Sequence, residues 1–140
     1  MSYQYHEGVT LADIAFSVEA KSPENLMVDG AKATFESMVD LKEVKPSKAM
    51  EIKLEAASME KLFFEWIEEL IYLKDSEEMA FSKFEVKITS GQKYFLKGKA
   101  FGEKISIKHN QKVDVKAITY HQFSVKKAGK GWKAFVVLDV

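Results

Sequence analysis

Residues 62–71 read Leu-Phe-Phe-Glu-Trp-Ile-Glu-Glu-Leu-Ile and carry the strongest periodic pattern in the chain. Its apolar residues recur at every third or fourth position, with the glutamates on the opposite side: Leu62, Phe63, Trp66, Ile67, Leu70 and Ile71. Just upstream, Ser58 is suited to be the N-cap of a helix. Phe64, Tyr72 and Leu73 widen the apolar face, and a helix that covers a sheet explains this width more simply than a partner-binding groove. The segment is therefore predicted to be a core helix.

A second helix is expected nearer the N-terminus. Ser22 and Pro23 are residue types that favour the N-cap and the first helical position, and apolar or small residues follow at helical spacing as far as Met38. Gly30 weakens this helix without breaking it. Between the two helices, the segment 51–56 alternates charged with apolar residues, which is typical of a half-buried strand.

Further strands are predicted on both sides of the helices. The N-terminal segment 9–16 reads as a strand that Asp13 interrupts. After the second helix, five segments rich in Val, Ile, Phe, Tyr and Thr are separated by short turn sequences: 80–89, 93–100, 104–108, 113–126 and 132–139. These segments predict an antiparallel sheet of hairpins. Because no repeat or linker divides the chain, residues 1–140 are predicted to form a single α+β domain, with an antiparallel-rich sheet or sheets and two main helices packed on it.

The composition limits the class of protein. A chain of 140 residues that is 46% hydrophobic is large enough to bury a core. It has no apolar run of the roughly 20 residues that span a bilayer, and its first residues lack the basic start and apolar middle of a signal peptide. We therefore expect a soluble, cytoplasmic protein without a membrane partner. The absence of cysteine excludes a disulfide framework and a thiol nucleophile.

Charge is distributed unevenly along the chain. Residues 1–82 contain 17 acidic and 8 basic side chains, whereas residues 83–140 contain 4 acidic and 13 basic ones. All 21 basic residues are lysines, so the bidentate guanidinium that reads base edges is missing. Sequence-specific reading of nucleic acid is therefore not expected, and lysines on the solvent side of amphipathic strands account for the basic half.

The sequence contains none of the strong catalytic signatures. It lacks the nucleophile elbow, the phosphate-binding loop, the dinucleotide-binding glycines and the zinc-peptidase motif. The three histidines, His6, His109 and His121, show no metal-ligand spacing. His121 lies on a mostly apolar predicted strand, where a histidine more often has a structural role.

Acidic groups mark both ends of the chain. Asp139 follows an apolar strand and precedes the last residue, Val140, so several carboxylate oxygens meet at one point. If the N-terminal and C-terminal strands pair, Asp13, Asp139 and the carboxylate of Val140 would form an all-oxygen site with a charge of about −3, which suits a hard cation such as calcium or magnesium. In the alternative reading, Asp13 ends a strand and Asp139 is a solvated tail residue.

Five elements of this sequence, in order along nearly the whole chain, resemble the archease family. They are the early Leu-Ala-Asp-Ile of residues 11–14, the helix 62–71, the pair Gly102-Glu103, the run Asp-Val-Lys-Ala-Ile-Thr-Tyr-His of residues 114–121, and the ending Trp-Lys-Ala-Phe-Val-Val-Leu-Asp-Val of residues 132–140. The combination of Lys-Ala-Ile-Thr-Tyr-His with a terminal Val-Leu-Asp-Val is the specific part of the resemblance.

The resemblance implies an accessory protein rather than an enzyme. Archeases are cofactors of RtcB, the RNA ligase of tRNA splicing and repair; they promote guanylylation of its active-site histidine and so allow multiple turnovers. The implied fold is a small α+β domain with a strand-helix-strand-strand insertion. The implied metal site, which holds calcium, consists of Asp13, Asp139 and Val140. Many family members carry His-Thr where this chain has Thr10 and Leu11.

Two further contacts and two alternative functions follow from these considerations. Lys116 and His121 are candidate contacts to the partner. If the strands pair as proposed, Lys116 would lie next to the cluster of Asp13, Asp139 and Val140, which we call the acidic tip. RNA would be reached only indirectly, through the ligase. The alternatives are a metal-dependent phosphoester hydrolase, in which the aspartates activate water, and an RNA-binding chaperone, in which lysine-rich strands hold RNA.

Overall fold

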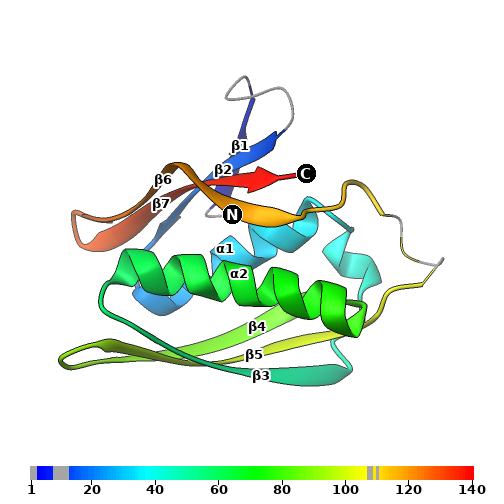
Figure 1. Ribbon diagram of the computed structural model, residues 1–140, viewed down its shortest axis with the longest axis horizontal. Coiled ribbons are helices and arrows are strands. Elements are labelled where there is room, and N and C mark those ends of the chain that lie inside the picture. Colours follow the sequence, from blue (N-terminus) through cyan, green and yellow to red (C-terminus); the bar gives the residue numbers. More distant parts are fainter. Residues whose placement is uncertain (1–2, 8–12, 107–108, 110) are drawn as a thin grey trace.

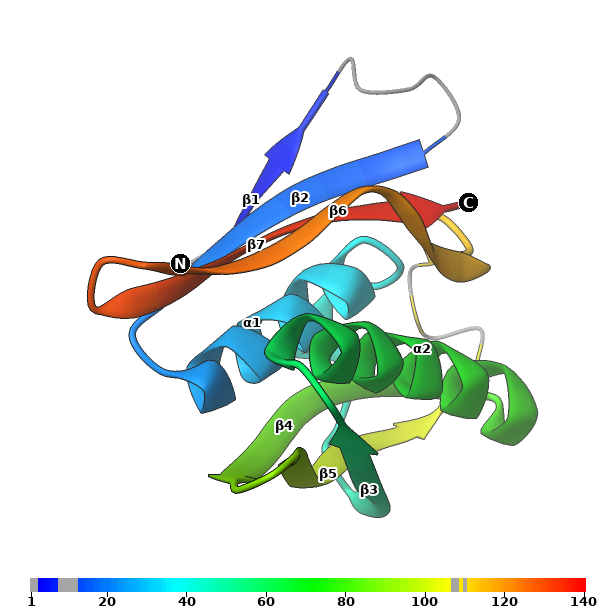
Figure 2. The ribbon, with the colours of Figure 1, turned by 60° about the vertical axis from the view of Figure 1, so that its left-hand side comes forward.

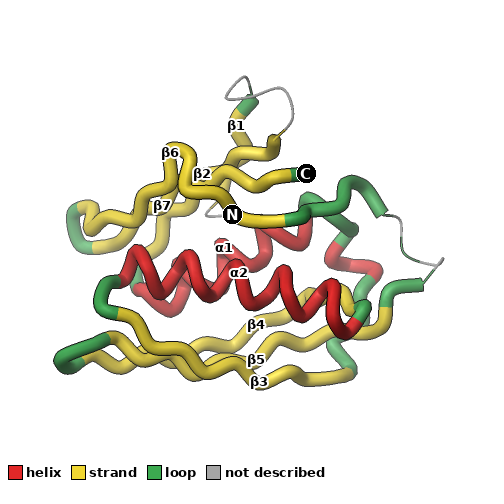
Figure 3. Tube along the Cα trace, in the orientation of Figure 1, coloured by secondary structure: helices red, strands yellow, loops and turns green. Residues whose placement is uncertain are grey.

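Two helices lie side by side between two antiparallel sheets, and this arrangement forms three layers (Figures 1 and 2). The structure is a computed structural model, and it describes residues 3–7, 13–106, 109 and 111–140. The elements, shown by type in Figure 3, follow the chain in the order β1 (Tyr3–His6), β2 (Asp13–Ala20), α1 (Pro23–Glu36), the 3-10 helix η1 (Leu41–Glu43), β3 (Lys48–Ala56), α2 (Met59–Glu77), β4 (Met79–Ser90), β5 (Tyr94–Lys104), β6 (Ala117–Ala128) and β7 (Gly131–Asp139).

The strand order separates the sheets. The four-stranded sheet has the order β1-β2-β7-β6, and the three-stranded sheet has the order β3-β5-β4. All neighbouring strands are antiparallel. The predicted α+β class is confirmed, and the expected insertion is present as the run β3-α2-β4-β5.

Both helices begin where the sequence predicts. The Ser22 hydroxyl accepts a hydrogen bond of 3.1 Å from the backbone N–H of Asn25, and Pro23 occupies the first position of α1. At the start of α2, the Ser58 hydroxyl accepts a hydrogen bond of 3.1 Å from the backbone N–H of Lys61. Each side chain satisfies an N–H group that has no partner within its helix.

Helix α2 is apolar on two sides because it contacts both sheets. On one side, the Trp66 ring packs edge-on against Phe84 of β4, with ring centroids 6.4 Å apart. A Cβ atom on Gly98 of β5 would lie 2.9 Å from the Trp66 ring, so glycine is needed there. On the other side, Phe64 stacks on Tyr120 of β6 at 4.0 Å. The predicted helix that covers a sheet is present, and its contact with a second sheet explains why the apolar face is wide.

The two helices approach each other closely at Gly30. A Cβ atom at this position would lie 2.6 Å from the Phe63 ring of α2. The indole Nε1–H of Trp66 donates a hydrogen bond of 2.9 Å to the carbonyl of Met27 in α1. The glycine that weakens the helix by propensity therefore allows the two helices to pack.

The prediction of one hairpin sheet in the C-terminal half is wrong, because β4 and β5 belong to one sheet and β6 and β7 to the other. Residues 105–106 and 113–116 were expected in strands, but β5 ends at Lys104 and β6 begins at Ala117. The connecting segment bonds elsewhere: the Ile105 N–H donates to Glu78, and the Lys112 N–H donates to Met38.

The N-terminal region differs from the prediction as well. The structure adds β1, whose alternating Tyr-Gln-Tyr-His sequence was not assigned to a strand. The first part of the expected strand 9–16, including Thr10 and Leu11, lies outside the described residues. Among the helices of the described part of the chain, none is long and apolar enough to cross a lipid bilayer.

Candidate functional site

The predicted meeting of the two chain ends is present. Strand β2 pairs with β7 along its full length, and Asp13 lies directly opposite Asp139 in this register. Figures 1 and 2 show the start of β2 beside the end of β7, next to the C-terminus. Directly opposite residues in antiparallel strands have Cβ atoms roughly 4.5–5.5 Å apart and point to the same face. The two carboxylates are therefore neighbours.

These carboxylates project from the outer face of the four-stranded sheet. Phe16 of β2 and Val136 of β7 form a paired, fully buried position in the core beneath the sheet. Because side chains alternate between faces, the odd-numbered residues Asp13 and Asp139 point away from the helices. Asp13 is half-buried and Asp139 is exposed, so the pair is accessible to a ligand or partner.

Strand β6 completes the row on the other side of Asp139. Ala117 lies opposite Asp139, and the backbone N–H of Lys116 donates a hydrogen bond of 2.8 Å to the Asp139 carbonyl. This hydrogen bond places Lys116 next to Asp139, as the sequence predicts, and the Lys116 side chain is exposed. Val140 follows Asp139 directly in the chain.

His121 is not part of this row. It is exposed and lies in an irregular part of β6 between Thr119 and Ser124, where the register with β7 shifts. Its backbone N–H donates a hydrogen bond of 3.3 Å to the Thr119 hydroxyl. The structure thus brings together Asp13, Asp139 and Lys116 but leaves His121 at a separate point on the strand.

The other two histidines have partners within the fold. His6 Nε2 lies 2.8 Å from the Ser17 hydroxyl. The buried ring of His109 accepts a hydrogen bond at Nδ1 from the Ser106 N–H, so Nε2 carries a proton in the neutral ring, 3.0 Å from Glu103 Oε2. Both histidines hold neighbouring segments together, in agreement with a structural role.

A hollow of about 490 Å³ adjoins Asp13. It lies between β1, the start of β2 and the end of α1, and two of its other lining residues are Glu7 and Glu36. These two acids lie near Asp13 together with Lys112, which also lines the hollow, and the sequence analysis identified none of the three for this site. The alternating residues of β1 were the available signal, because a strand there must lie beside β2.

Tyr5 forms an uncharged wall of this hollow. Its hydroxyl donates a hydrogen bond of 2.6 Å to the carbonyl of Ala33 in α1. Burial raises the pKa of the Tyr5 hydroxyl, and the nearby Tyr3 and Glu36 raise it further. Tyr5 therefore stays protonated at neutral pH and fixes β1 against the helix.

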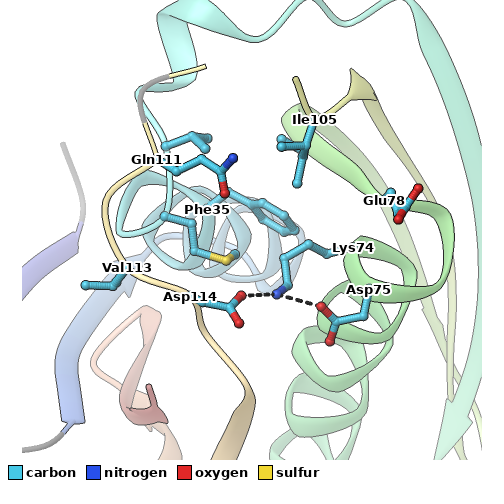
Figure 4. A pocket seen from close by; sticks show the side chains of 11 residues that line it. Phe35, Lys74, Asp75, Glu78, Ile105, Gln111, Val113 and Asp114 are labelled. Atoms are coloured by element: carbon cyan, nitrogen blue, oxygen red, sulfur yellow. Dashed lines mark hydrogen bonds and ion pairs between the residues drawn. The ribbon is translucent and has the colours of Figure 1, made fainter. Parts of the chain in front are cut away.

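A second hollow, of about 410 Å³, contains the buried cation Lys74 (Figure 4). The Lys74 side chain is 6% exposed, and its ammonium lies 2.7 Å from Asp114 Oδ1 and 2.8 Å from Asp75 Oδ1. Burial lowers the pKa of Lys74, but the hydrogen bonds to Asp114 and Asp75 outweigh this effect and raise it overall. The pair with Asp114 attaches α2 to the segment that leads into Lys116, and so helps to position β6 beside the acidic residues.

The donor set at the chain ends fits a hard cation in its chemistry. Asp13 and Asp139 offer carboxylate oxygens, and Val140 offers backbone oxygens, the ligands that calcium and magnesium prefer. Within the residues that the structure describes, no three His, Cys, Asp or Glu side chains are grouped to hold a metal ion by themselves. A cation here would therefore need the oxygens of Val140 together with water or groups from a partner.

Comparisons with known proteins give a consistent result. A family model described as the archease protein family matches residues 3–140. Protein archease of Methanopyrus kandleri is 37% identical over 131 residues, covering 92% of this chain and 94% of the relative. Protein archease of Pyrococcus abyssi is 38% identical over 132 residues, covering 92% and 93%.

Solved structures are similar over nearly the whole chain. The solution structure of Methanobacterium thermoautotrophicum protein 1598 is 29% identical, covers 99% of both chains and has a TM-score of 0.88. A crystal structure from Thermotoga maritima, described as an archease and possible chaperone, covers 98% of this chain and 100% of that one. It has a TM-score of 0.61 at 22% identity and therefore supports the fold alone.

Proposed function

The chain belongs to the archease family, and from this membership we propose that it is an accessory protein that activates an RtcB-type RNA ligase. In this proposal, it promotes guanylylation of the ligase and thereby allows multiple turnovers in tRNA splicing. It is not itself an enzyme. It acts in the cytoplasm, which agrees with a chain that contains no cysteine.

The observation that supports this proposal best is the direct pairing of Asp13 with Asp139. Two like charges directly opposite each other in a sheet are destabilising. An uncharged residue in place of either aspartate would remove this repulsion. Because the pair costs stability and lies on an accessible face, we infer that it serves binding. Positively charged ligands, either a divalent cation or a basic surface, relieve the repulsion.

We assign the metal site to Asp13, Asp139 and Val140, with calcium as the cation and magnesium as the alternative. A divalent cation at this place would supply a positive charge that binds phosphate oxygens. The paired strands fix the positions of the two aspartates, and the Lys116 N–H fixes the Asp139 carbonyl. We propose that this acidic tip enters the nucleotide-binding site of the ligase and rearranges it for guanylylation.

The proposed partner contacts are Lys116, just before β6, and His121 on β6. The Lys116 side chain is exposed beside the tip and would meet an acidic or phosphate group of the ligase. His121, five residues after Lys116, would form a separate contact rather than join the metal site. The tip itself reaches RNA only through the ligase.

The test is a ligation time course with excess RNA substrate, run with and without this protein. We expect the wild type to convert a single-turnover ligase into a multiple-turnover one, and Asp139→Asn to lose this effect while remaining folded. Glu19→Gln is the matched control, because Glu19 is an acid on the same face of β2 but lies opposite Lys133. Full activation by Asp139→Asn would contradict the proposal. Phosphoester cleavage by the purified chain alone would favour the hydrolase alternative.

A further inference from the structure

The outer face of the three-stranded sheet carries a row of three lysines. Lys53 of β3 lies directly opposite Lys97 of β5, which lies directly opposite Lys87 of β4. All three are exposed, and the alternate residues of these strands face the helices. We call Lys53, Lys97 and Lys87 the lysine row. Three adjacent positive charges on neighbouring strands repel each other, so this row costs stability.

Protection of the sheet edges against pairing with other chains does not explain the whole lysine row. Lysines on edge strands prevent pairing with other chains, which accounts for Lys53 on β3 and Lys87 on β4. Lys97 is on the central strand, where no edge needs protection. In the neighbouring row, Lys99 lies between Glu51 and Glu85, which is the arrangement that favours stability.

The lysine row also forms no direct ion pairs with the described residues. Over the described part of the chain, none of its three ammonium groups takes part in an ion pair. A hollow of about 350 Å³ lies over the row, and its charged lining consists of the three lysines and Lys99 against two glutamates, Glu51 and Glu85, so positive charge is in excess. Charge complementarity therefore points to an anionic ligand with several charges, held across the three strands.

Two aromatic rings, one exposed and one half-buried, flank the lysines on the same face. Phe95 is 46% exposed and lies two residues from Lys97 along β5. Phe101 lies two residues beyond Lys99, and the Lys83 ammonium is 5.1 Å from the centre of its ring. A smaller hollow of about 230 Å³ is lined by Phe95 together with Lys87 and Lys97. Aromatic rings next to cations on an antiparallel sheet are the arrangement that binds single-stranded nucleic acid, with bases on the rings and phosphates on the cations.

We propose that this face binds single-stranded RNA directly. The lysine row contacts the phosphates, and Phe95 stacks on a base. Because the chain contains no arginine, this binding does not depend on base sequence. The face lies on the far side of the helices from the acidic tip (Figure 1), so both surfaces can be occupied together. The inference is independent of the ligase proposal, because no ligase takes part in the binding.

The experiment measures fluorescence anisotropy of a labelled oligouridylate of about 12 nucleotides, titrated with the full chain between about 20 and about 200 mM salt. Three phosphate contacts predict that log K falls with log salt at a slope of about −2, and Lys97→Ala should reduce this slope by about 0.7. Phe95→Ala should weaken binding about tenfold. Lys133→Ala is the control, because Lys133 pairs with Glu19 on the other sheet at 3.6 Å, and it should bind as the wild type does.

Three results would overturn the inference. The first is no binding of oligouridylate at the lowest salt. The second is equal binding of inorganic polyphosphate together with an unchanged affinity of Phe95→Ala, which would indicate a response to any polyanion. The third is preferential binding of an acidic peptide, which would assign the face to a protein partner. Circular dichroism of each variant confirms that it is folded, so a loss of binding reports on the surface.

Discussion

Replacing Asp139 by Asn should stabilise the protein. The substitution removes one of two carboxylates that lie opposite each other in β2 and β7 and leaves the shape nearly unchanged. For two unit charges about 6 Å apart in water-like surroundings, Coulomb's law gives a repulsion of about 0.7 kcal/mol, which screening at physiological salt halves. The free energy of unfolding should therefore rise by about 0.5 kcal/mol at low salt, and the melting temperature by about 2 °C.

The assay is urea unfolding of both proteins, followed by tryptophan fluorescence at low and at high salt. The difference should disappear at about 1 M salt, where the screening length is about 3 Å. Glu19→Gln is the control, and it should lower the free energy of unfolding because Glu19 lies opposite Lys133. If Asp139→Asn were no more stable than the wild type at low salt, the two carboxylates would not repel each other and the inferred site would lose its physical basis.

The second part of this experiment measures how calcium changes the stability of the wild type and of Asp139→Asn. A cation that binds the folded state stabilises it, by about 2.7 kcal/mol at a concentration one hundred times its dissociation constant. Calcium should therefore raise the melting temperature of the wild type, and chelation should reverse the effect. Asp139→Asn should respond much less, so the order of the two stabilities reverses at saturating calcium. An equal response in both proteins would place the cation elsewhere.

Three further predictions concern the fold. Gly98→Val forces a side chain against Trp66 and should lower the free energy of unfolding by about 1–3 kcal/mol in urea, whereas Gly91→Ala, with no atom within 4 Å of the added carbon, should have little effect. Lys74→Met removes a buried cation whose carboxylate partners are exposed, so the same measurement should show a loss of about 1 kcal/mol rather than the larger cost of stranding a buried charge. The pKa of Tyr5 is raised above its ordinary value of 10.0, so the folded state keeps this proton when the unfolded chain loses it, and the free energy of unfolding should fall as the pH rises above 10. Tyr5→Phe should show a shallower fall. An identical pH profile in both proteins would contradict this assignment.

Local signals in the sequence were sufficient for the helices and for most strands. Ser22 and Ser58 both cap helices as predicted, because capping depends on a residue and its neighbours within one turn. The alternation in 51–56 similarly marks one exposed and one buried face. The short strand β1 was missed because four residues give little periodicity against a predicted turn region.

The division of the strands between two sheets could not be predicted in this way. Hairpin signals show that β4 pairs with β5 and β6 with β7, but they do not show whether the two hairpins join. That choice depends on the segment between them, which bonds to α1 and α2 instead of extending a sheet. The width of the apolar face on α2 was the one sequence feature that reflected a second sheet.

The sequence by itself determined the residue types of the candidate site and their position at strand ends, since Asp13 and Asp139 interrupt or end apolar strands. Only the tertiary structure decided that they face each other. Asp13 and Asp139 are 126 positions apart in the sequence, and the register that pairs their strands is set by packing of the whole sheet on the helices. The same is true of Glu7 and Glu36 beside Asp13 and of the lysine row. Local pattern fixes which face a side chain occupies, and long-range packing fixes which side chains become its neighbours.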